Sequence, residues 1–137
     1  MLFRSALEVI KANPDFFELE ILTAYNNADL LIEQSLQFNP NAVVIVNKKY
    51  YRKVSEALAS TEIKVYAGAD AVDQIVETDE IDIVLAAIVG YAGLRSTIAA
   101  IKANKQIALA NKETLVVAGD LVMKLAQIGR ASCRERV

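Results

Sequence analysis

The sequence contains no histidine, and this absence excludes several kinds of active site. A serine–histidine–aspartate triad, a cysteine–histidine pair and a histidine zinc site all require that side chain. The single cysteine, Cys133, excludes an internal disulfide and fits a reducing compartment, so we expect a cytoplasmic protein. The longest apolar run, "IVLAAIVGYAGL" at residues 83–94, is too short and too glycine-broken to cross a bilayer, and we expect no membrane partner.

A strong basic charge and a glycine-rich nucleotide fingerprint are also absent. The net charge is −2, which gives no electrostatic footprint for nucleic acid. No G-x-G-x-x-G occurs, and Gly90 and Gly93 are the only close pair of glycines. The 137 residues and the hydrophobic content of 54% are nevertheless enough for one domain with a real core.

Both ends of the chain look foreign to the rest. The tail "IGRASCRERV" is basic and shows no periodicity, and it follows a clean helical pattern. One short DNA string, read on opposite strands, encodes both Leu2–Ser5 and Ile128–Arg130, and it resembles a sequencing adapter. We therefore interpret residues 1–5 and 128–137 as adapter-derived, non-native ends, and residues 6–127 as a domain cut at both sides. The alternative is a pair of genuine polar termini.

Between these ends, helix and strand patterns alternate strictly. Such alternation with short connections predicts an α/β fold, a doubly wound and mainly parallel sheet with helices on both faces. These sheets normally begin on a strand and a phosphate-binding glycine turn, so we expect that first strand and Gly-rich turn to be missing. The expected helices are 6–13, 27–38, 48–60, 69–78, 94–104 and 113–127, and the expected strands 17–23, 42–47, 63–68, 81–90 and 105–110.

In open α/β sheets, ligands bind outside the carboxyl ends of the strands, and the first unusual strand end is "TAYNN". Tyr25, Asn26 and Asn27 follow the strand, with no acidic residue there to pair the ribose of NAD. The two amides can donate hydrogen bonds and do not repel a 2′-phosphate. The alternative is structural: Asn27 caps the next helix and Asn26 makes a turn.

Two further strand ends are unusual. In "AAIVGYAGL", small residues allow a flat ring to approach the backbone, or they form a tight strand-to-helix turn. In "LANKETLVVAG", Asn111 can orient a ligand amide or hydroxyl, and Lys112 can face an anionic substrate. Glu113 can accept a hydrogen bond from a ribose or nicotinamide group. The alternative is that Asn111 caps a helix whose solvated first turn contains Lys112 and Glu113.

Taken in order, these motifs resemble one enzyme family. "ALANKETLVVAG" is similar to the signature "LANKES-L-V-G" of 1-deoxy-D-xylulose 5-phosphate reductoisomerase, and "AAIVGYAGL" resembles that family's "A-I-V-G-A-A-G-L". "ALEVIKANPDFF" resembles its first helix, and "LIEQSLQFNPNAVVI" also fits. The resemblance covers residues 6–126, and the joint occurrence of the motifs is highly specific although no single one is.

The resemblance implies a partial Rossmann-like NADPH-binding domain over residues 6–127. The family is an NADPH-dependent oxidoreductase and isomerase that converts 1-deoxy-D-xylulose 5-phosphate to 2-C-methyl-D-erythritol 4-phosphate, in the non-mevalonate route to isoprenoids. By motif match, Asn111, Glu113 and Asn27 would contact NADPH, with Tyr25 and Asn26 in the same loop as Asn27. Lys112 would contact the phosphosugar substrate.

The resemblance also implies what this chain does not carry. The carboxylates for the divalent metal, manganese or magnesium, would follow Gln127, so we expect no catalytic or metal-ligating residue within the chain. We therefore expect the chain alone to be inactive and to bind NADPH weakly or undetectably, and we expect its parent enzyme to be a homodimer. Without the first strand we also expect poor solubility or self-association.

Two departures from the family pattern and one rival interpretation remain. Many members carry Gly-Lys-Asn where this chain has Tyr25-Asn26-Asn27, which brings the 2′-phosphate contact into question, and Tyr91 replaces a smaller residue. The rival is a non-catalytic nucleotide-binding module or a flavodoxin-like regulatory receiver. A receiver requires an aspartate at the end of its central strand, whereas "AVVIVNKK" ends in Asn47-Lys48.

Overall fold

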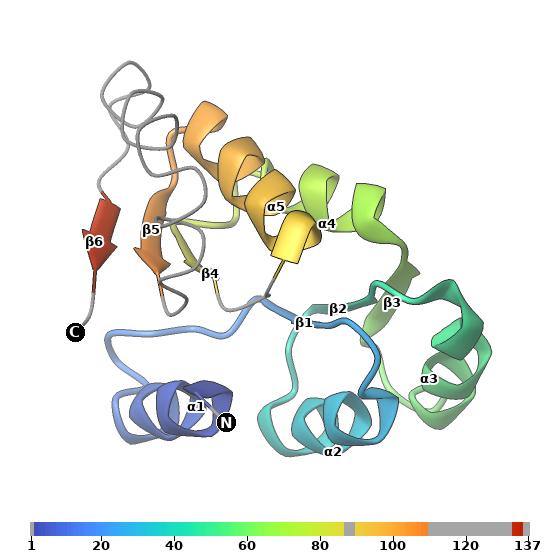
Figure 1. The fold of residues 1–137 in the computed structure, drawn as a ribbon. Helices are drawn as coiled ribbons and strands as arrows, with labels where there is room; N and C mark the ends of the chain where they lie inside the picture. The colour runs from blue at the N-terminus through green and yellow to red at the C-terminus, as the bar shows by residue number, and fades with distance from the viewer. Residues whose placement is uncertain (1, 87–89, 110–132, 136–137) are drawn as a thin grey trace. The chain divides into compact units, whose positions relative to one another are not determined.

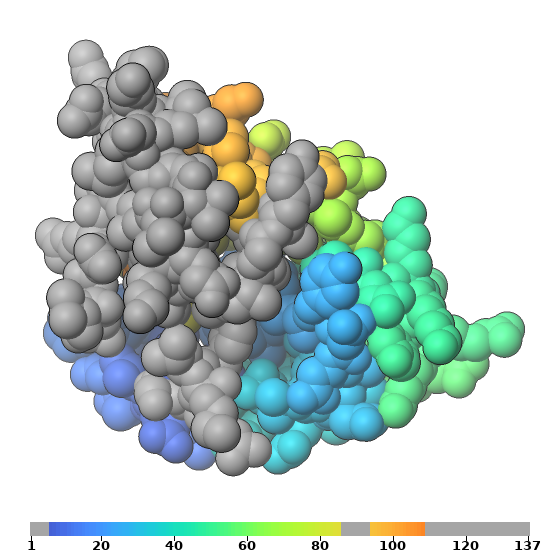
Figure 2. All heavy atoms as spheres, in the orientation of Figure 1, coloured from blue at the N-terminus to red at the C-terminus, as the bar shows by residue number. Residues whose placement is uncertain are grey.

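The computed structural model describes the backbone of residues 2–86, 90–109 and 133–135 (Figure 1). Side chains are described for residues 6–85 and 94–108, the coloured atoms of Figure 2. The chain forms two compact units, Met1–Val72 and Asp73–Val137.

The first unit is built around a parallel sheet of three strands in the order β1-β2-β3. The register pairs Ile21 with Ala42 and Ala24 with Ile45, and β2 pairs with β3 in the same sense. The elements are α1 (Leu2–Ala12), β1 (Ile21–Ala24), α2 (Ala28–Phe38), β2 (Ala42–Ile45), the 3₁₀ helix η1 (Lys48–Tyr50), α3 (Tyr51–Ala57), β3 (Lys64–Ala67) and α4 (Ala69–Ile75), which crosses the boundary between the units.

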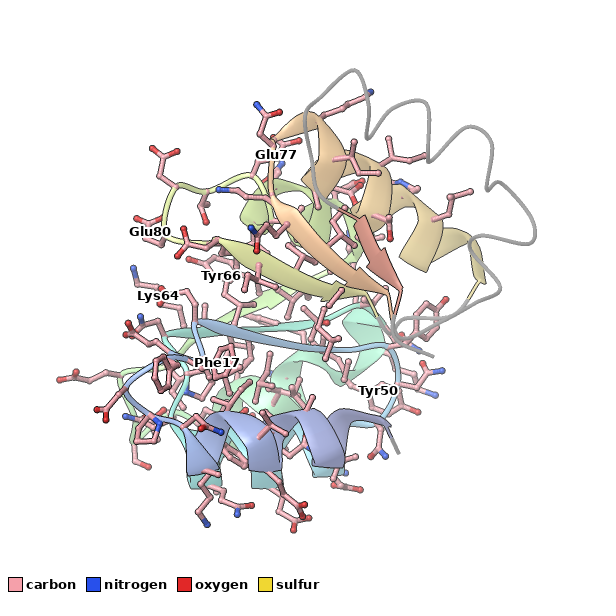
Figure 3. The ribbon with its side chains drawn as sticks, turned by 90° about the vertical axis from the view of Figure 1, so that its left-hand side faces the viewer. Phe17, Tyr50, Lys64, Tyr66, Glu77 and Glu80 are labelled. Carbon is pink, nitrogen blue, oxygen red and sulfur yellow. The ribbon has the colours of Figure 1, made fainter. Side chains whose placement is uncertain are left out.

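The central strand β2 is the best-buried element of this unit. Val43 and Ile45 are fully buried among apolar residues of the helices, including Leu31 of α2 and Val54 of α3. Val44, on the opposite face of the strand, is equally buried. The continuous β-branched run therefore forms a strand covered on both faces, as its pattern predicts. Figures 1 and 3 show α1 and α2 on the same side of this sheet.

Two expected boundaries in this unit were wrong. The strand expected from Phe17 begins only at Ile21, because its partner β2 begins at Ala42 and the ladder needs a partner. Phe16 and Phe17 instead donate their backbone N–H groups to the carbonyl of Asn13 in a turn. The first helix begins at Leu2, ahead of the expected start at residue 6.

The second unit contains a separate parallel sheet in the order β4-β5-β6. Its elements are β4 (Ile83–Ala86), α5 (Gly90–Lys102), β5 (Gln106–Leu109) and β6 (Cys133–Glu135), and α5 packs against β4 and β5. Two polar contacts stabilise it. Arg95 of α5 pairs with Asp73 of α4 at 2.5 Å, and the nearly buried Lys105 donates from Nζ to the carbonyl of Thr78 at 2.7 Å.

The boundary expected within "AAIVGYAGL" was also wrong. The strand ends at Ala86 and α5 begins at Gly90, so Gly90 and Gly93 lie in the first turn of a helix and not in a loop. The strand β6 lies in a segment where the sequence predicts no element, and the helix expected over residues 113–127 lies outside the described residues.

The predicted fold class is confirmed. Every strand pair among the described residues is parallel, and helices alternate with strands from α1 to β5. Among the described residues, no helix combines the length and the apolar character that crossing a bilayer would require.

Candidate functional site

The carboxyl ends of β1, β2 and β3 lie at one edge of the first sheet, because the three strands are parallel and in register. We call this the carboxyl edge and define it as residues 25–27 after β1, residues 46–49 after β2 and Gly68 after β3. It is the place where open parallel sheets bind their ligands.

Hydrogen bonds join the first two loops of the carboxyl edge. The N–H of Val46 donates to the carbonyl of Ala24 at 2.9 Å, and the N–H of Asn47 donates to that of Tyr25 at 3.0 Å. The side chains continue the same pairing, because Nδ2 of Asn47 donates to Oδ1 of Asn26 at 2.8 Å. The ladder thus extends two residues past the strands and holds both loops in place.

The orientation of the Asn26 amide follows from this network. The N–H of Lys49 donates to Oδ1 of Asn47 at 3.1 Å, which leaves the NH₂ group of Asn47 to face Asn26. Oδ1 of Asn26 must then accept, and its own NH₂ group is left on the exposed side with two donor hydrogens. An exposed amide held with its donors outward suits an anionic or hydroxyl-bearing ligand.

Asn27 caps a helix, as the structural alternative in the sequence analysis predicts. It is the N-cap of α2, and its Oδ1 accepts from the N–H of Leu30 at 3.1 Å. Its carbonyl accepts from Leu31, and the carbonyl of Asn26 accepts from Ala28 in the bend between them. The cap uses only the oxygen of the Asn27 side chain, so its NH₂ group can still donate to a ligand.

Replacing Asn27 with alanine should lower the free energy of unfolding of the first unit by about 1 kcal/mol, because the N–H of Leu30 loses its acceptor. Urea unfolding followed by tyrosine fluorescence measures this change. Asn27→Asp retains an accepting oxygen and is the matched control. An alanine variant as stable as the parent would show that the cap contributes nothing.

Gly68 directly follows β3 and has a φ of 99°, a backbone conformation that residues with a side chain rarely adopt. Its N–H donates to the carbonyl of Ile45 at 3.0 Å, so the loop after β3 is also attached to β2. A Cβ atom at this position would lie 2.8 Å from Cε of Lys48. The alkyl part of Lys48 therefore occupies the space that the glycine leaves open.

The carboxyl edge is cationic. Lys48 and Lys49 are exposed, and within the described part of the chain neither forms an ion pair. The nearest acidic residue of α2, Asp29, is paired with Nζ of Lys53 at 2.7 Å. The structure thus adds four residues that the sequence did not assign to a site, namely Asn47, Lys48, Lys49 and Gly68. Adjacency of β1 and β2 in the sheet is the signal that would have found them.

The remaining candidates divide between the two units. Tyr25 is half-exposed on the carboxyl edge, beside Asn26. The other three candidates, Asn111, Lys112 and Glu113, lie outside the described residues. The last described residue before them is Leu109, where β5 ends. Ala86 pairs with Leu109, so the segments that follow β4 and β5 leave their sheet at the same edge.

The part of the chain that the structure describes contains no candidate metal site. No group of three or more histidine, cysteine, aspartate or glutamate side chains converges there. These residues therefore do not fit a divalent metal site, and no chemical step through a metal is assigned to them.

Comparison with known proteins gives a consistent result. The family model for 1-deoxy-D-xylulose 5-phosphate reductoisomerase matches residues 3–119. The enzyme of that name from Phocaeicola vulgatus is 62% identical over 121 residues, which are 88% of this chain and 32% of the relative. The chain therefore spans about a third of the curated relatives it matches.

Two solved structures of reductoisomerases are also similar to this chain. The 1-deoxy-D-xylulose 5-phosphate reductoisomerase from Zymomonas mobilis in complex with NADPH superposes with a TM-score of 0.89 and 36% identity, covering 96% of this chain and 35% of that one. A reductoisomerase in complex with NADPH, fosmidomycin and magnesium gives a TM-score of 0.91 and 34% identity, covering 98% and 33%. From the matched model and these likenesses, the chain belongs to the 1-deoxy-D-xylulose 5-phosphate reductoisomerase family.

Proposed function

We propose that this chain is the NADPH-binding part of an enzyme that converts 1-deoxy-D-xylulose 5-phosphate to 2-C-methyl-D-erythritol 4-phosphate. The family match over residues 3–119 carries the proposal. The carboxyl edge supports it independently, because two loops present amide donors and two lysines where parallel sheets bind nucleotides.

In this proposal the residues of the first unit hold the adenosine end of NADPH. Asn26 offers its two outward N–H donors, Asn27 its NH₂ group, and Tyr25 an exposed aromatic ring. Asn111 and Glu113 contact the cofactor farther along, and Lys112 presents its charge to the phosphosugar. When bound, NADPH supplies the hydride for the reduction.

The proposal extends to the complete enzyme. In this proposal its divalent metal, manganese or magnesium, is held by carboxylates that this chain does not carry. Residues 6–127 are the native domain in this view, with residues 1–5 and 128–137 foreign to it. We further propose a cytoplasmic enzyme without a nucleic-acid partner, because no disulfide can form within the chain and the net charge is weakly negative. We also propose that the parent enzyme is a homodimer.

A graft tests the proposed function. Residues 6–119 of this chain replace the matching segment of the Phocaeicola vulgatus reductoisomerase, and turnover of 1-deoxy-D-xylulose 5-phosphate is followed by NADPH oxidation with manganese present. We expect kcat/KM within about tenfold of the parent enzyme, because binding residues and fold are retained while some packing across the graft changes. The ungrafted 137-residue chain is the negative control and should give no turnover.

Two results would contradict the proposal. A grafted enzyme that is folded and dimeric but has no turnover would show that these residues cannot serve the reaction. Turnover by the isolated chain would show that the catalytic residues lie within it, against the assignment of metal ligands elsewhere.

A further inference from the structure

The loop after β1, which the proposal places next to the adenosine ribose of NADPH, carries no charged side chain. NADPH differs from NADH by a 2′-phosphate on that ribose. Asn26 and Asn27 offer amide donors but no charge, while a 2′-phosphate carries between one and two negative charges at neutral pH. Hydrogen bonds to neutral donors are roughly half as strong as bonds to charged ones. If this chain selects the phosphorylated cofactor, a cation from another element has to lie within reach of Asn26.

We propose that Lys48 and Lys49, in the loop after β2, supply this charge and make the carboxyl edge selective for a 2′-phosphorylated nucleotide. The inference rests on the proposed function, since it names the residues that choose between the two forms of the cofactor at that site. It assigns a specificity role to a different loop from the one that carries Asn26.

The hydrogen bonds of Asn47 bring the two loops together. Asn47 donates from Nδ2 to Asn26 at 2.8 Å and accepts at Oδ1 from the N–H of Lys49 at 3.1 Å. One side chain therefore links the neutral amide to the backbone of the lysine pair. Through Asn47, the backbone that carries the lysine pair is held beside the loop of Asn26.

The lysine pair is available to an anion, whereas other cations of this unit are not. Among the described residues, no carboxylate pairs with Lys48 or Lys49. Lys53 is already paired with Asp29, which also removes the nearest repulsive charge from α2. Lys64 begins β3, and Figure 3 places it at the opposite end of the sheet from Tyr50, which follows the lysine pair.

The acidic residues near this edge do not cancel the lysine pair. Asp29 is neutralised by Lys53 at 2.7 Å, and Asp70, in the first turn of α4 after Gly68, has an interaction of its own. The stem of Lys48 rests over Gly68, in the space where any other residue would have its Cβ atom. Among the described residues, no carboxylate therefore compensates the charge of the lysine pair.

Nucleotide titration of the full chain tests the inference. The probes are adenosine 2′,5′-bisphosphate and adenosine 5′-monophosphate, which differ only in the 2′-phosphate, and binding is followed by amide shifts in ¹⁵N NMR spectra. These spectra report affinities as weak as about 1 mM. We expect the bisphosphate to bind about tenfold more tightly, and the double variant Lys48→Met/Lys49→Met to reduce this preference to about twofold or less.

Matched variants separate charge from structure. Lys64→Met removes one positive charge from the other end of the same sheet and should leave the preference unchanged. Lys48→Arg/Lys49→Arg keeps both charges and should retain it. Raising the ionic strength from about 50 to 300 mM should weaken the preference in the parent chain but not in the double methionine variant.

The outcomes distinguish the inference from the function on which it rests. Binding of both nucleotides with an unchanged preference in the double methionine variant would overturn the role of the lysines and leave the nucleotide site intact. Shifts with neither nucleotide at millimolar concentration in a folded chain would overturn the inference, whereas the proposed function is tested separately by turnover of the grafted enzyme. A loss of preference in Lys64→Met equal to that in the double variant would show an effect of net charge alone.

Discussion

Replacing Lys112 with methionine in the grafted enzyme should lower kcat/KM for 1-deoxy-D-xylulose 5-phosphate by about 30- to 100-fold. The proposal places its ammonium group against an anionic substrate, and hydrogen bonds to charged groups contribute about 1.5–3 kcal/mol. Methionine retains the length of the side chain and removes only the charge. The KM for NADPH should change by no more than about twofold, because Lys112 is assigned to the substrate and not to the cofactor.

Steady-state kinetics with each substrate varied in turn measures both effects. Lys102, the exposed last residue of α5, provides the matched control, and Lys102→Met should leave both parameters unchanged. If Lys112→Met raised the KM for NADPH and spared the phosphosugar, the lysine would belong to the cofactor site. If it changed neither, the motif match would have no functional meaning at this position.

Replacing Ile45 with alanine should destabilise the first unit by about 2–5 kcal/mol, which is a large part of the stability of an ordinary domain. Ile45 is fully buried at the end of β2, in contact with the cluster that includes Leu31 and Val54. Alanine leaves a cavity there that short, paired strands cannot close by shifting. The same strand positions Asn47, so we expect the carboxyl edge to lose its order together with the core.

Urea unfolding followed by tyrosine fluorescence measures this loss in dilute solution, where self-association is weakest. The chain has no tryptophan, and four of its five tyrosines lie in the first unit: Tyr25, Tyr50, Tyr51 and Tyr66. Leu36→Ala on the exposed side of α2 is the control and should stay within about 0.5 kcal/mol of the parent. An Ile45→Ala variant with an unchanged midpoint would mean that β2 is not the core of this unit.

The alternation of patterns was enough to predict the parallel fold, because apolar periodicity depends on local sequence. The β-branched run of β2 correctly indicated a strand covered on both faces, with Val43 and Val44 both fully buried. Element boundaries were less predictable. The start of β1 depends on where β2 offers a partner, and Phe17 has strand character without one. Gly90 could equally end a strand or begin a helix, and the structure has the helix.

The candidate site was only partly predictable for a similar reason. The sequence could predict Asn27 as a helix cap, because the capping bond reaches only to Leu30, three residues farther along the chain. The bond between Asn26 and Asn47 spans 21 positions, and it follows only once β1 and β2 are known to be neighbours in register. At the other end of these strands, Asn41 bonds the carboxylate of Glu20 with the same spacing, at 2.8 Å. Both hydrogen bonds form only because β1 and β2 are neighbours in the sheet.

The one-directional hydrogen-bond chain through Asn47 also constrains how this loop pair can vary among relatives. A lysine at position 26 has no oxygen to accept from Asn47, so that exchange alone would leave a donor without its partner. Positions 26 and 47 should therefore substitute in a correlated manner, and a chimaera that moves one loop without the other combines incompatible halves. We therefore expect that residues 25–27 and 46–49 have to be exchanged together when this loop pair is moved between relatives.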